Sequence, residues 1–280
     1  MSKKAELTPI LKWVGGKRQS LDIILPLVPQ KISTYYEPFV GGGAVFFALQ
    51  PKRAVINDIN IELMNVYQVI KTDVQGLLQR LAKAAENHSE DFYYEVRERD
   101  RNQDLYDRLS AIDKAARTIY LNKTCYNGLY RVNTDGKFNT PYGKYKNPNI
   151  INRDSILNLH AYLNKANVQI RCDDYRRVLS TARHGAFVYF DPPYMPISET
   201  ANFTSYTADG FDIEQQVMLK QTCDDLTRRG IKFLLSNANT WIIRQLYRKY
   251  KIKIIKAKRT INSAGNKRGD VEEVLVRNYD

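Results

Sequence analysis

The spacing of apolar residues changes twice along this chain, and that change constrains the fold more than any other feature. Residues 35–57 contain a strand-like run, a glycine-rich loop, a short helical pattern and a second strand-like run. From about residue 61 to residue 121 the apolar residues recur at helical spacing, and from residue 168 onward strand and helix patterns alternate again. Because such alternation is typical of a sheet covered by helices, we predict one α/β sheet built from both ends of the chain.

The individual segments predict where the elements lie. Strands are expected at VQIRC, AFVYFD, IKFLLSN, KIKIIKA and EEVLVRN, and helices near residues 213–229 and 240–250. Asn-Gly and Asp-Gly pairs predict a hairpin with strands at residues 130–133 and 137–139. The helices before it should bury the apolar residues Leu63, Val66, Tyr67, Ile70, Leu77, Leu78, Leu81, Ala115, Ile119 and Tyr120. We therefore predict a sheet domain of residues 1–61 and 166–280, and a mainly helical insertion of residues 62–165 that carries a β-hairpin.

Composition excludes several classes of protein. No apolar stretch approaches the ~20 residues of a membrane span, and the start of the chain lacks the apolar core of a signal peptide. We therefore expect a soluble, cytoplasmic protein. The 3 cysteines and 3 histidines are scattered and form no Cys-x-x-Cys pair, so neither a disulfide framework nor a zinc site is predicted. Chemistry is expected to proceed without a metal.

The charge of the chain points to an anionic partner. The formal net charge is +13, which opposes compaction unless a partner offsets it. Residues 244–268 contain many lysines and arginines and no acidic residue, and a second basic stretch at residues 117–146 is interleaved with tyrosines. Either run alone is best interpreted as a solvated face. Two such runs in a chain with 19 tyrosines favour nucleic acid as the partner.

The sequence FVYFDPPY at residues 187–194 predicts a buried strand with a functional end. The run FVYF has the length and composition of a central strand, whereas consecutive prolines cannot donate to a ladder or continue a helix. Asp191, two prolines and Tyr194 are thereby held in fixed relation at the carboxyl end of the strand. Ligands bind at that end of open α/β sheets.

The glycine-rich loop EPFVGGGAVFF predicts close approach of a ligand to the backbone. It does not match the dinucleotide fingerprint, because Phe46 stands where the third glycine is required. A Walker loop around Gly16 and Lys17 is also excluded, because it would require glycine at Leu11 and serine or threonine at Arg18. Asp58 ends the next predicted strand, where a carboxylate is placed to accept hydrogen bonds from ribose hydroxyls. Without the glycine loop, Asp58 would be better explained as the N-cap of the helix that follows.

The segment LKWVGGKRQ carries a second glycine pair, between Trp13 and Lys17. It can be interpreted as a turn with an exposed lysine. As a binding site, it offers an aromatic face to a cation and an ammonium to a carboxylate. S-adenosylmethionine, with its sulfonium and its carboxylate, is a ligand of that kind.

Three motifs in this order, KWVGGK (residues 12–17), EPFVGGG (37–43) and DPPY (191–194), resemble the DNA adenine methylase (Dam) family. The resemblance covers nearly the whole chain and extends to YNGLYR, FNTPYGKYKNP and PISETANFTSYT. It implies a Rossmann-like, S-adenosylmethionine-dependent methyltransferase sheet with an inserted target-recognition domain. It further implies a bacterial or phage enzyme that methylates adenine N6 at GATC in double-stranded DNA, and acts as a monomer without an obligate protein partner.

The same resemblance assigns roles to particular residues. Those implied for catalysis are Asp191, Pro192 and Tyr194. Those implied for the cofactor are Trp13, Lys17, Glu37, Phe39, Gly41, Gly43, Asp58, Asp173 and Asp191, with Asp174 an alternative to Asp173. Those implied for DNA are Lys12, Tyr126, Asn127, Leu129, Arg131 and Pro141. Arg131 is expected to recognise a guanine and Tyr126 to fill the gap left by an extruded adenine, whereas Leu129 and Pro141 are also explained as packing residues.

Other functions stay open at this point. The same chemistry on RNA, or on cytosine N4, requires similar motifs, and a DNA-binding regulator without catalysis could keep the fold. Asp rather than Ser before the two prolines favours adenine, and the insertion favours duplex DNA. A role in marking replicated DNA and a role in a restriction-modification system are equally compatible with the sequence.

Overall fold

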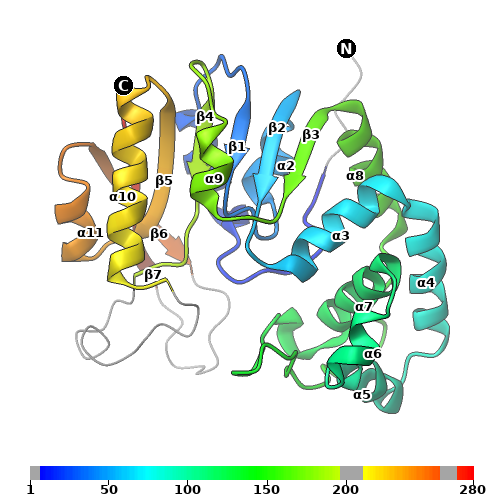
Figure 1. The fold of residues 1–280 in the computed structure, drawn as a ribbon. Coiled ribbons are helices and arrows are strands. Elements are labelled where there is room, and N and C mark those ends of the chain that lie inside the picture. Colours follow the sequence, from blue (N-terminus) through cyan, green and yellow to red (C-terminus); the bar gives the residue numbers. More distant parts are fainter. Residues whose placement is uncertain (1–6, 196–210, 259–269) are drawn as a thin grey trace. The chain divides into compact units, whose positions relative to one another are not determined.

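A computed structural model describes residues 7–195, 211–258 and 270–280. Its strands form one seven-stranded sheet in the order β3-β2-β1-β4-β5-β7-β6 (Figure 1). Their bounds are β1 Tyr35–Glu37, β2 Arg53–Asn57, β3 Asn167–Arg171, β4 Phe187–Phe190, β5 Lys232–Ala238, β6 Lys251–Lys258 and β7 Asp270–Arg277. β1 pairs in parallel with β2 and β4, β4 pairs in parallel with β5, and β7 is antiparallel to both β5 and β6. The predicted mixed α/β, Rossmann-like sheet is confirmed.

The chain divides into two compact units. Unit 1 consists of Met1–Arg18, Gly41–Gln50 and Asp58–Cys172, and unit 2 of Gln19–Val40, Pro51–Asn57 and Asp173–Asp280. These units are defined by which residues pack together, whereas the predicted boundaries at residues 62 and 165 separate a cofactor-binding domain from a target-recognition domain. The target-recognition domain of residues 62–165 stays a prediction.

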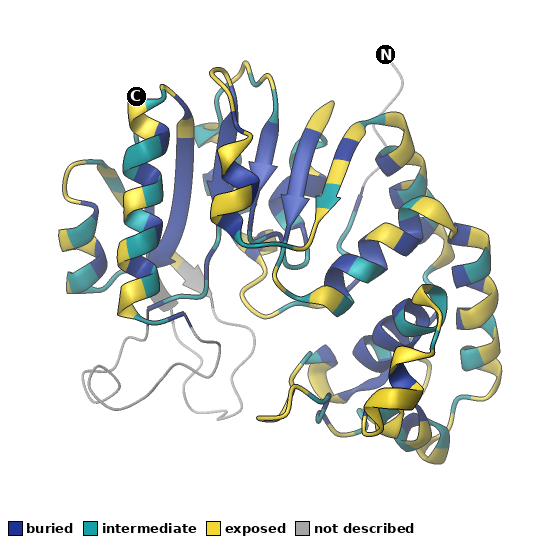
Figure 2. Ribbon diagram, viewed as in Figure 1, coloured by how far each residue is buried: buried dark blue, intermediate teal, exposed yellow. Residues whose placement is uncertain are grey.

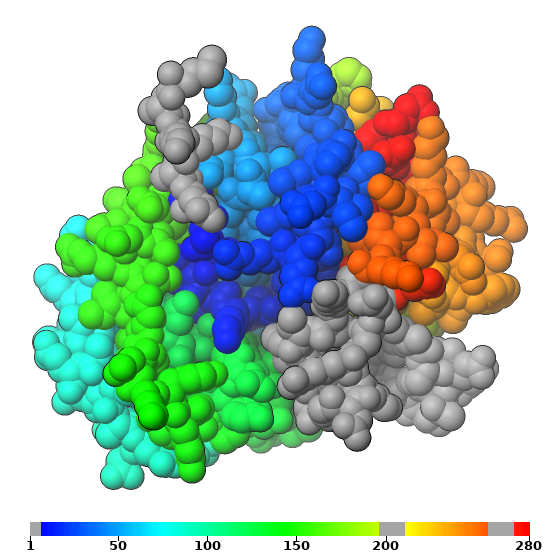
Figure 3. All heavy atoms as spheres, turned by 180° about the vertical axis from the view of Figure 1, so that it is seen from behind, coloured from blue at the N-terminus to red at the C-terminus, as the bar shows by residue number. Residues whose placement is uncertain are grey.

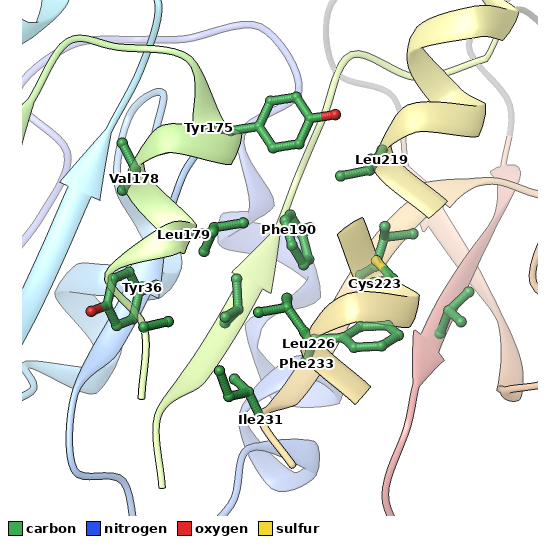
Figure 4. Packing of buried hydrophobic residues seen from close by; sticks show 14 of the residues in the cluster. Tyr36, Tyr175, Val178, Leu179, Phe190, Leu219, Cys223, Leu226, Ile231 and Phe233 are labelled. Carbon is green, nitrogen blue, oxygen red and sulfur yellow. The ribbon is translucent and has the colours of Figure 1, made fainter. Parts of the chain in front are cut away.

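The core of unit 2 lies between its strands and the helices that pack on them. The helical elements of this unit are α1 Leu21–Ile24, η2 Leu25–Leu27, α9 Tyr175–Ser180, α10 Ile213–Arg228 and α11 Trp241–Leu246. All residues of β4 are buried, as expected for a central strand. Leu219, Cys223 and Leu226 lie on one face of α10, and Figure 4 shows them directed toward the sheet residues Phe190 and Phe233. Figure 2 shows α10 with exposed residues along its outer side, which is the pattern of an amphipathic helix.

Unit 1 is mainly helical. Its helical elements are α2 Ala44–Leu49, α3 Ile61–Thr72, α4 Val74–Glu86, α5 Glu90–Glu98, α6 Gln103–Asp107, α7 Ala111–Thr124, η3 Tyr126–Gly128 and α8 Arg153–Lys165. α7 packs against α3, α4 and α5. Every apolar residue that the helical spacing assigned to a buried face in residues 63–120 is buried. That part of the sequence prediction is confirmed.

Many of the helices begin at a residue whose side chain caps the first turn. Side-chain oxygens of the residues before α3, α4, α5, α6, α7, α10 and α11 accept hydrogen bonds from backbone N–H groups of the first turn, and these N-caps are Asn60, Asp73, Ser89, Asn102, Ser110, Asp212 and Thr240. Such caps satisfy donors that no helical carbonyl reaches.

The predicted hairpin is present as a short antiparallel pair rather than as two full strands. Val132 and Phe138 form an antiparallel bridge, and a second bridge joins Cys125 to Tyr142. The segment PISETANFTSYT and the basic residues from 259 to 268 lie outside the described residues. Within the described ranges, no helix is both long and apolar enough to cross a membrane.

Candidate functional site

The glycine-rich loop has a backbone that side chains would obstruct. Gly41 and Gly43, which precede α2, have φ angles of +47° and +73°. A Cβ atom at Gly41 would lie 2.9 Å from Cδ1 of Trp13, and one at Gly43 would lie 2.8 Å from the Tyr67 hydroxyl. The same hydroxyl donates a hydrogen bond to the Gly41 carbonyl, at 3.0 Å. Glycine is therefore required at both positions by conformation and by space.

Asp58 is bonded to this loop. Its Oδ2 accepts a hydrogen bond from the Gly41 N–H at 3.0 Å, and its Oδ1 accepts one from the Asn60 N–H at 3.0 Å. The N-cap of α3 is Asn60, whose side chain accepts from the Leu63 N–H, so the N-cap explanation of Asp58 is wrong. Burial raises the pKa of Asp58, and the backbone N–H groups oppose that shift.

The amino-terminal motif places an aromatic ring against the loop and buries its lysine. Trp13 stacks on Tyr130, with ring centroids 4.9 Å apart. Lys17, the first residue of the 3-10 turn η1 (Lys17–Ser20), is 6% exposed, and its Nζ donates to the Gly15 carbonyl at 2.9 Å. A turn with an exposed lysine is therefore the wrong explanation of this motif. An ammonium group held at low exposure is typical of a site where it pairs with an anion.

In unit 2, Asn57, the last residue of β2, holds the backbone of Asp173. The Asn57 Nδ2 donates to the Pro38 and Asp173 carbonyls, both at 3.0 Å, and its Oδ1 accepts from the Asp173 N–H at 2.9 Å. Asp174 instead caps α9 and pairs with Arg176 at 2.8 Å, and that hydrogen bond lowers the pKa of Asp174. Asp173 also has local partners, since its Oδ1 accepts from the Asp174 N–H at 2.8 Å and lies 3.5 Å from Nη1 of Arg177. The choice of Asp173 over Asp174 as a cofactor residue therefore stays a prediction. The sequence analysis did not single out Asn57.

Glu37 and Phe39 follow one another closely at the end of β1. Glu37 is 2% exposed and accepts a hydrogen bond from the Tyr35 hydroxyl at 2.6 Å. The Phe39 ring lies 5.2 Å from that of Tyr175 and 5.7 Å from that of Phe211, measured between centroids. Phe39 is therefore part of an aromatic cluster, and its packing alone accounts for an aromatic residue at this position.

The DPPY segment leaves β4 as predicted, and its two candidate functional side chains, Asp191 and Tyr194, have specific partners. The Ser236 hydroxyl donates to Oδ1 of Asp191 at 2.9 Å. The Tyr194 hydroxyl donates to Oε2 of Glu273 at 3.0 Å. Burial raises the pKa of Tyr194 well above its usual value, so the phenol keeps the proton that it donates.

A buried amide pair holds the backbone of the same segment. The Gln216 Nε2 donates to the Pro193 carbonyl at 3.0 Å, and Oδ1 of Asn237 accepts from the Met195 N–H at 3.2 Å. The two amides are joined by a hydrogen bond from the Asn237 Nδ2 to Gln216 at 3.0 Å, and both residues are fully buried. The prolines are thus only part of what fixes this turn. The sequence analysis missed both amides, although the polar Ser-Asn pair inside the apolar β5 is a signal that could have identified one of them.

The six predicted DNA-contacting residues all lie in unit 1, and most of them are on its surface. Exposed side chains are those of Lys12, Tyr126, Asn127, Arg131 and Pro141, while Leu129 is half-buried. Tyr126 is 57% exposed, which is unusual for a large aromatic residue. Figure 3 shows the segment of residues 126–150, in green, on the surface of this unit.

Asn122, in the last turn of α7, brings the amino-terminal motif and the turn at residues 126–128 together. Its Oδ1 accepts from the Lys12 N–H at 2.9 Å, and its Nδ2 donates to the carbonyls of Lys12 and Gly128, at 2.9 and 3.1 Å. A Cβ atom at Gly128 would lie 2.5 Å from Cδ of Lys12. Across the turn, the Tyr126 N–H donates to the Pro141 carbonyl at 2.8 Å. These contacts place Lys12, Tyr126 and Pro141 in one group.

A basic hollow of about 210 Å³ adjoins this group. Its lining residues are Lys12, Asn122, Lys123, Gly128, Tyr145, Asn147, Pro148 and Asn149. Burial and the charge of Lys12 lower the pKa of Lys123. Two ammonium groups that repel one another across a hollow are an electrostatic feature suited to an anion.

Arg131 is oriented by a single residue across the hairpin. Its Nε donates to Oδ1 of Asn139 at 2.7 Å, and its Nη2 donates to the Asn139 carbonyl at 3.2 Å. The turn between them is closed by Asn133, whose N–H donates to the Lys137 carbonyl at 2.9 Å and whose Oδ1 accepts from the Lys137 N–H at 2.9 Å. A guanidinium held along one edge presents its remaining donors in a fixed direction.

The predicted site residues therefore form two sets, each within one unit. In unit 1 the structure joins Lys12, Trp13, Gly41, Gly43, Asp58 and the turn at residues 126–128 through Asn122, Tyr130 and Tyr67. Lys17 lies in the same unit. Unit 2 carries Glu37, Phe39, Asp173, Asp191, Pro192 and Tyr194 at the carboxyl ends of β1, at the start of α9 and after β4. Among the described residues, no group of three or more His, Cys, Asp or Glu side chains is placed to hold a metal ion.

Comparison with known proteins identifies the family. A family model described as D12 class N6 adenine-specific DNA methyltransferase matches residues 13–261. The chain belongs to this family. A type II methyltransferase of Lactococcus lactis subsp. cremoris is 42% identical over 276 residues, covering 99% of this chain and 97% of the relative. The DNA adenine methylase of Escherichia coli is 37% identical over 270 residues, covering 95% of this chain and 93% of the relative.

A third relative, a type II methyltransferase of Methanocaldococcus jannaschii, is 43% identical over 292 residues and is covered completely. The D12 class assignment confirms the predicted enzyme class, adenine-specific DNA methyltransferase. It implies a DNA substrate and S-adenosylmethionine as the methyl donor. It gives no support to the alternatives of an RNA substrate, cytosine N4 as acceptor, or a regulator without catalysis.

Proposed function

We propose that this D12 class methyltransferase modifies adenine N6 at GATC in double-stranded DNA, by direct transfer to an adenine extruded from the duplex. The observation that carries the proposal is the DPPY turn, whose Asp191 accepts from Ser236 while its backbone is held by Gln216 and Asn237. A turn held on both sides offers a carboxylate and the adjacent Pro192 carbonyl at one spacing. Two such acceptors suit the two N–H groups of an exocyclic amine.

The proposed mechanism depends on positioning. An adenine in a duplex must leave the stack, at a cost of a few kcal/mol. Stacking on Tyr194, whose hydroxyl is fixed by Glu273, would recover about 1–3 kcal/mol of that cost. When Asp191 and the Pro192 carbonyl accept hydrogen bonds from the two amino N–H groups, the nitrogen becomes pyramidal. Its lone pair is then less delocalised into the ring. A carboxylate has about four acceptor sites, so the bond from Ser236 is compatible with this role. Rate acceleration then comes from orientation and electrostatics.

The residues of unit 1 fit S-adenosylmethionine, which supplies an activated methyl group when bound. Gly41 and Gly43 leave no room for a side chain, so the loop offers its backbone to the methionine part of the cofactor. Asp58 is assigned to the ribose hydroxyls, and Trp13 and Lys17 to the sulfonium and carboxylate. In unit 2 we assign Glu37, Phe39 and Asp191 to the same cofactor, together with Asp173, which is assigned to the adenine ring.

The exposed group on unit 1 is proposed to read the DNA. Arg131 would donate to the O6 and N7 atoms of a guanine, with Asn139 holding the opposite edge of its guanidinium. Tyr126 would enter the gap left by the adenine, with Asn127 close to the unpaired base. Leu129 and Pro141 would contact adjacent bases, and Lys12 the outer guanine. The basic hollow beside Lys12 supports a nearby phosphate contact.

A methyl-transfer assay tests the proposal. The protein and labelled S-adenosylmethionine are incubated with duplexes that contain GATC, that carry one substituted base pair in this site, or that lack adenine, and with an RNA of the same sequence. Transfer to the GATC duplex alone is expected. Equal transfer to the substituted duplexes would remove GATC as the site. Transfer to the adenine-free duplex or to RNA would overturn the proposed acceptor.

A further inference from the structure

Two consecutive side chains of unit 1 hold the outer edge of the hairpin that carries Arg131. Phe138 lies opposite Val132 in an antiparallel bridge, and the flanking pairs at Arg131 with Asn139 and at Asn133 with Lys137 carry the hydrogen bonds between the two arms. The N–H and C=O groups of a residue between two hydrogen-bonded pairs point away from the opposite arm. Those of Phe138 therefore need partners outside the hairpin.

Asp100 and Arg101 supply these partners. The Phe138 N–H donates to Oδ2 of Asp100 at 2.9 Å, and Nη2 of Arg101 donates to the Phe138 carbonyl at 2.7 Å. Nη1 of Arg101 also donates to Oδ1 of Asp100, again at 2.7 Å. The pair satisfies Phe138 in the way that a neighbouring strand would, so it fixes which residue of the hairpin faces the helices.

This pair is itself anchored in the helical core. Asp100 is 6% exposed and forms an ion pair with Arg117, also 6% exposed, at 2.8 Å. Arg117 donates in addition to the carbonyls of Val96 and Arg97 at the end of α5, at 2.9 and 2.8 Å. Removal of one partner of a buried ion pair is strongly unfavourable, so Arg117 holds Asp100 in place. The hairpin is thus attached to a rigid point of unit 1.

The attachment lies one residue from the pair that orients Arg131. Phe138 precedes Asn139, which accepts both hydrogen bonds from the Arg131 guanidinium. The Phe138 ring, 2% exposed, contacts Tyr130 edge-on with centroids 5.6 Å apart. A change of register at Phe138 would move both Tyr130 and Arg131.

We propose that Asp100 and Arg101 are positioning residues for target specificity, which hold the hairpin of residues 130–139 so that Arg131 meets one base pair of the site. The inference rests on the proposed function, because it assigns base reading to Arg131. Neither residue belongs to a motif that the sequence analysis used. If either residue is removed, the hairpin should become less rigid and the enzyme should act more readily on duplexes with a wrong base pair. Turnover on the correct duplex should change less.

Arg101→Ala is the appropriate test, because Arg101 is partly exposed and its loss leaves the Asp100–Arg117 ion pair in place. Arg108→Ala removes the same charge from an exposed position nearby and serves as the matched control. Discrimination is measured as the ratio of kcat/KM on the GATC duplex to kcat/KM on the duplex substituted at the base pair that depends on Arg131. We expect Arg101→Ala to lower this ratio roughly three- to tenfold, part of what a bidentate arginine contributes. Arg101→Lys should lower the ratio less, and Arg108→Ala should leave it unchanged.

Hydrogen exchange provides a readout that is independent of activity. Amides of residues 136–140 should exchange faster in Arg101→Ala, and those of α7 at the wild-type rate. Wild-type discrimination in Arg101→Ala, with discrimination lost in Arg131→Ala, would overturn the inference and leave the proposed function intact. An equal loss of activity on all duplexes would also overturn it, because the role would then be structural. A wild-type protein inactive on every duplex would overturn the proposed function and the specificity role together.

Discussion

The loop after β4 and the hairpin of residues 130–139 both carry candidate functional side chains, but they are held in different ways. Behind the loop, Gln216 and Asn237 are fully buried and bind its backbone from within unit 2. The hairpin is largely exposed, and side chains hold it at a few points, chiefly through Phe138. A buried network suits chemistry, because reacting groups must keep one geometry. An exposed hairpin suits a surface that approaches a large substrate.

The largest expected effect is at Asp191. Asp191→Ala removes an acceptor for the amino protons, and we expect turnover at saturating DNA and cofactor to fall about 100- to 1,000-fold, as when one oriented polar group is lost from an active site. Duplex affinity should change little, since the exposed group that is proposed to read the DNA is untouched. Single-turnover methyl transfer and a binding titration measure the two quantities. The exposed Asp22→Ala, in the same unit, is the control. Near-normal turnover of Asp191→Ala would remove this residue from the mechanism.

The next effect tests the buried network itself. Gln216→Ala removes the donor to the Pro193 carbonyl and the acceptor of the Asn237 Nδ2, and each unsatisfied buried group costs about 1–3 kcal/mol. We expect the free energy of unfolding to fall by about 2–4 kcal/mol, and turnover to fall even under conditions where the protein is folded. Denaturant unfolding and single-turnover kinetics check these expectations. The adjacent Gln215→Ala should change neither. If Gln216→Ala lost stability but kept full turnover, the network would support the fold without positioning the loop.

The two regions also differ in what the sequence could predict. The strand end at Asp191 and the glycine loop were predictable, because an apolar run of strand length and a proline or glycine break act locally along the chain. The buried helix faces followed from spacing for the same reason. Gln216, by contrast, is separated by 23 residues from the carbonyl it binds, and Asn122 by 110 residues from Lys12. An amide that is buried and bonded looks like a surface amide in the sequence, so these contacts depend on tertiary structure.

The hairpin shows the same limit. Its turn was predictable from the Asp135-Gly136 pair, and Arg131 was singled out from a resemblance. The attachment through Asp100 was not, because two charged residues after a helix are most simply interpreted as a solvated segment. Only the structure shows that their side chains replace a strand. Positioning residues are therefore harder to predict than the residues they position.

A smaller effect is expected at Arg131. Arg131→Ala should reduce discrimination at one base pair by about 1–3 kcal/mol, the usual contribution of a bidentate arginine to guanine, with a smaller change in turnover on the GATC duplex. Stability should be nearly unchanged, because the side chain is exposed and bonds only to Asn139 among the described contacts. Kinetics on duplexes substituted at each base pair in turn measure the effect, with Arg108→Ala as the charge control. A uniform loss on all duplexes would show that Arg131 binds phosphate and not a base.

The smallest effect is expected at Asp174. It tests whether the loss of unfolding free energy depends on how far a side chain is buried or on the unit in which it lies. Asp174 lies in unit 2 beside Asp173, yet it is partly exposed and pairs with Arg176. Asp174→Asn keeps an N-cap oxygen but loses the ion pair, so the free energy of unfolding should fall by only a few tenths of a kcal/mol at pH 7. Because the hydrogen bond from Arg176 lowers the pKa of Asp174, this contribution is present above the unfolded pKa of about 3.9 and disappears as the pH falls through the lower folded value. Urea unfolding of both proteins at pH 7 and at about pH 3 measures the difference. If Asp174→Asn lowered the free energy of unfolding as much as Gln216→Ala does, or lowered it equally at acidic pH, the comparison would fail. Exposure would then not explain why the loop and the hairpin differ.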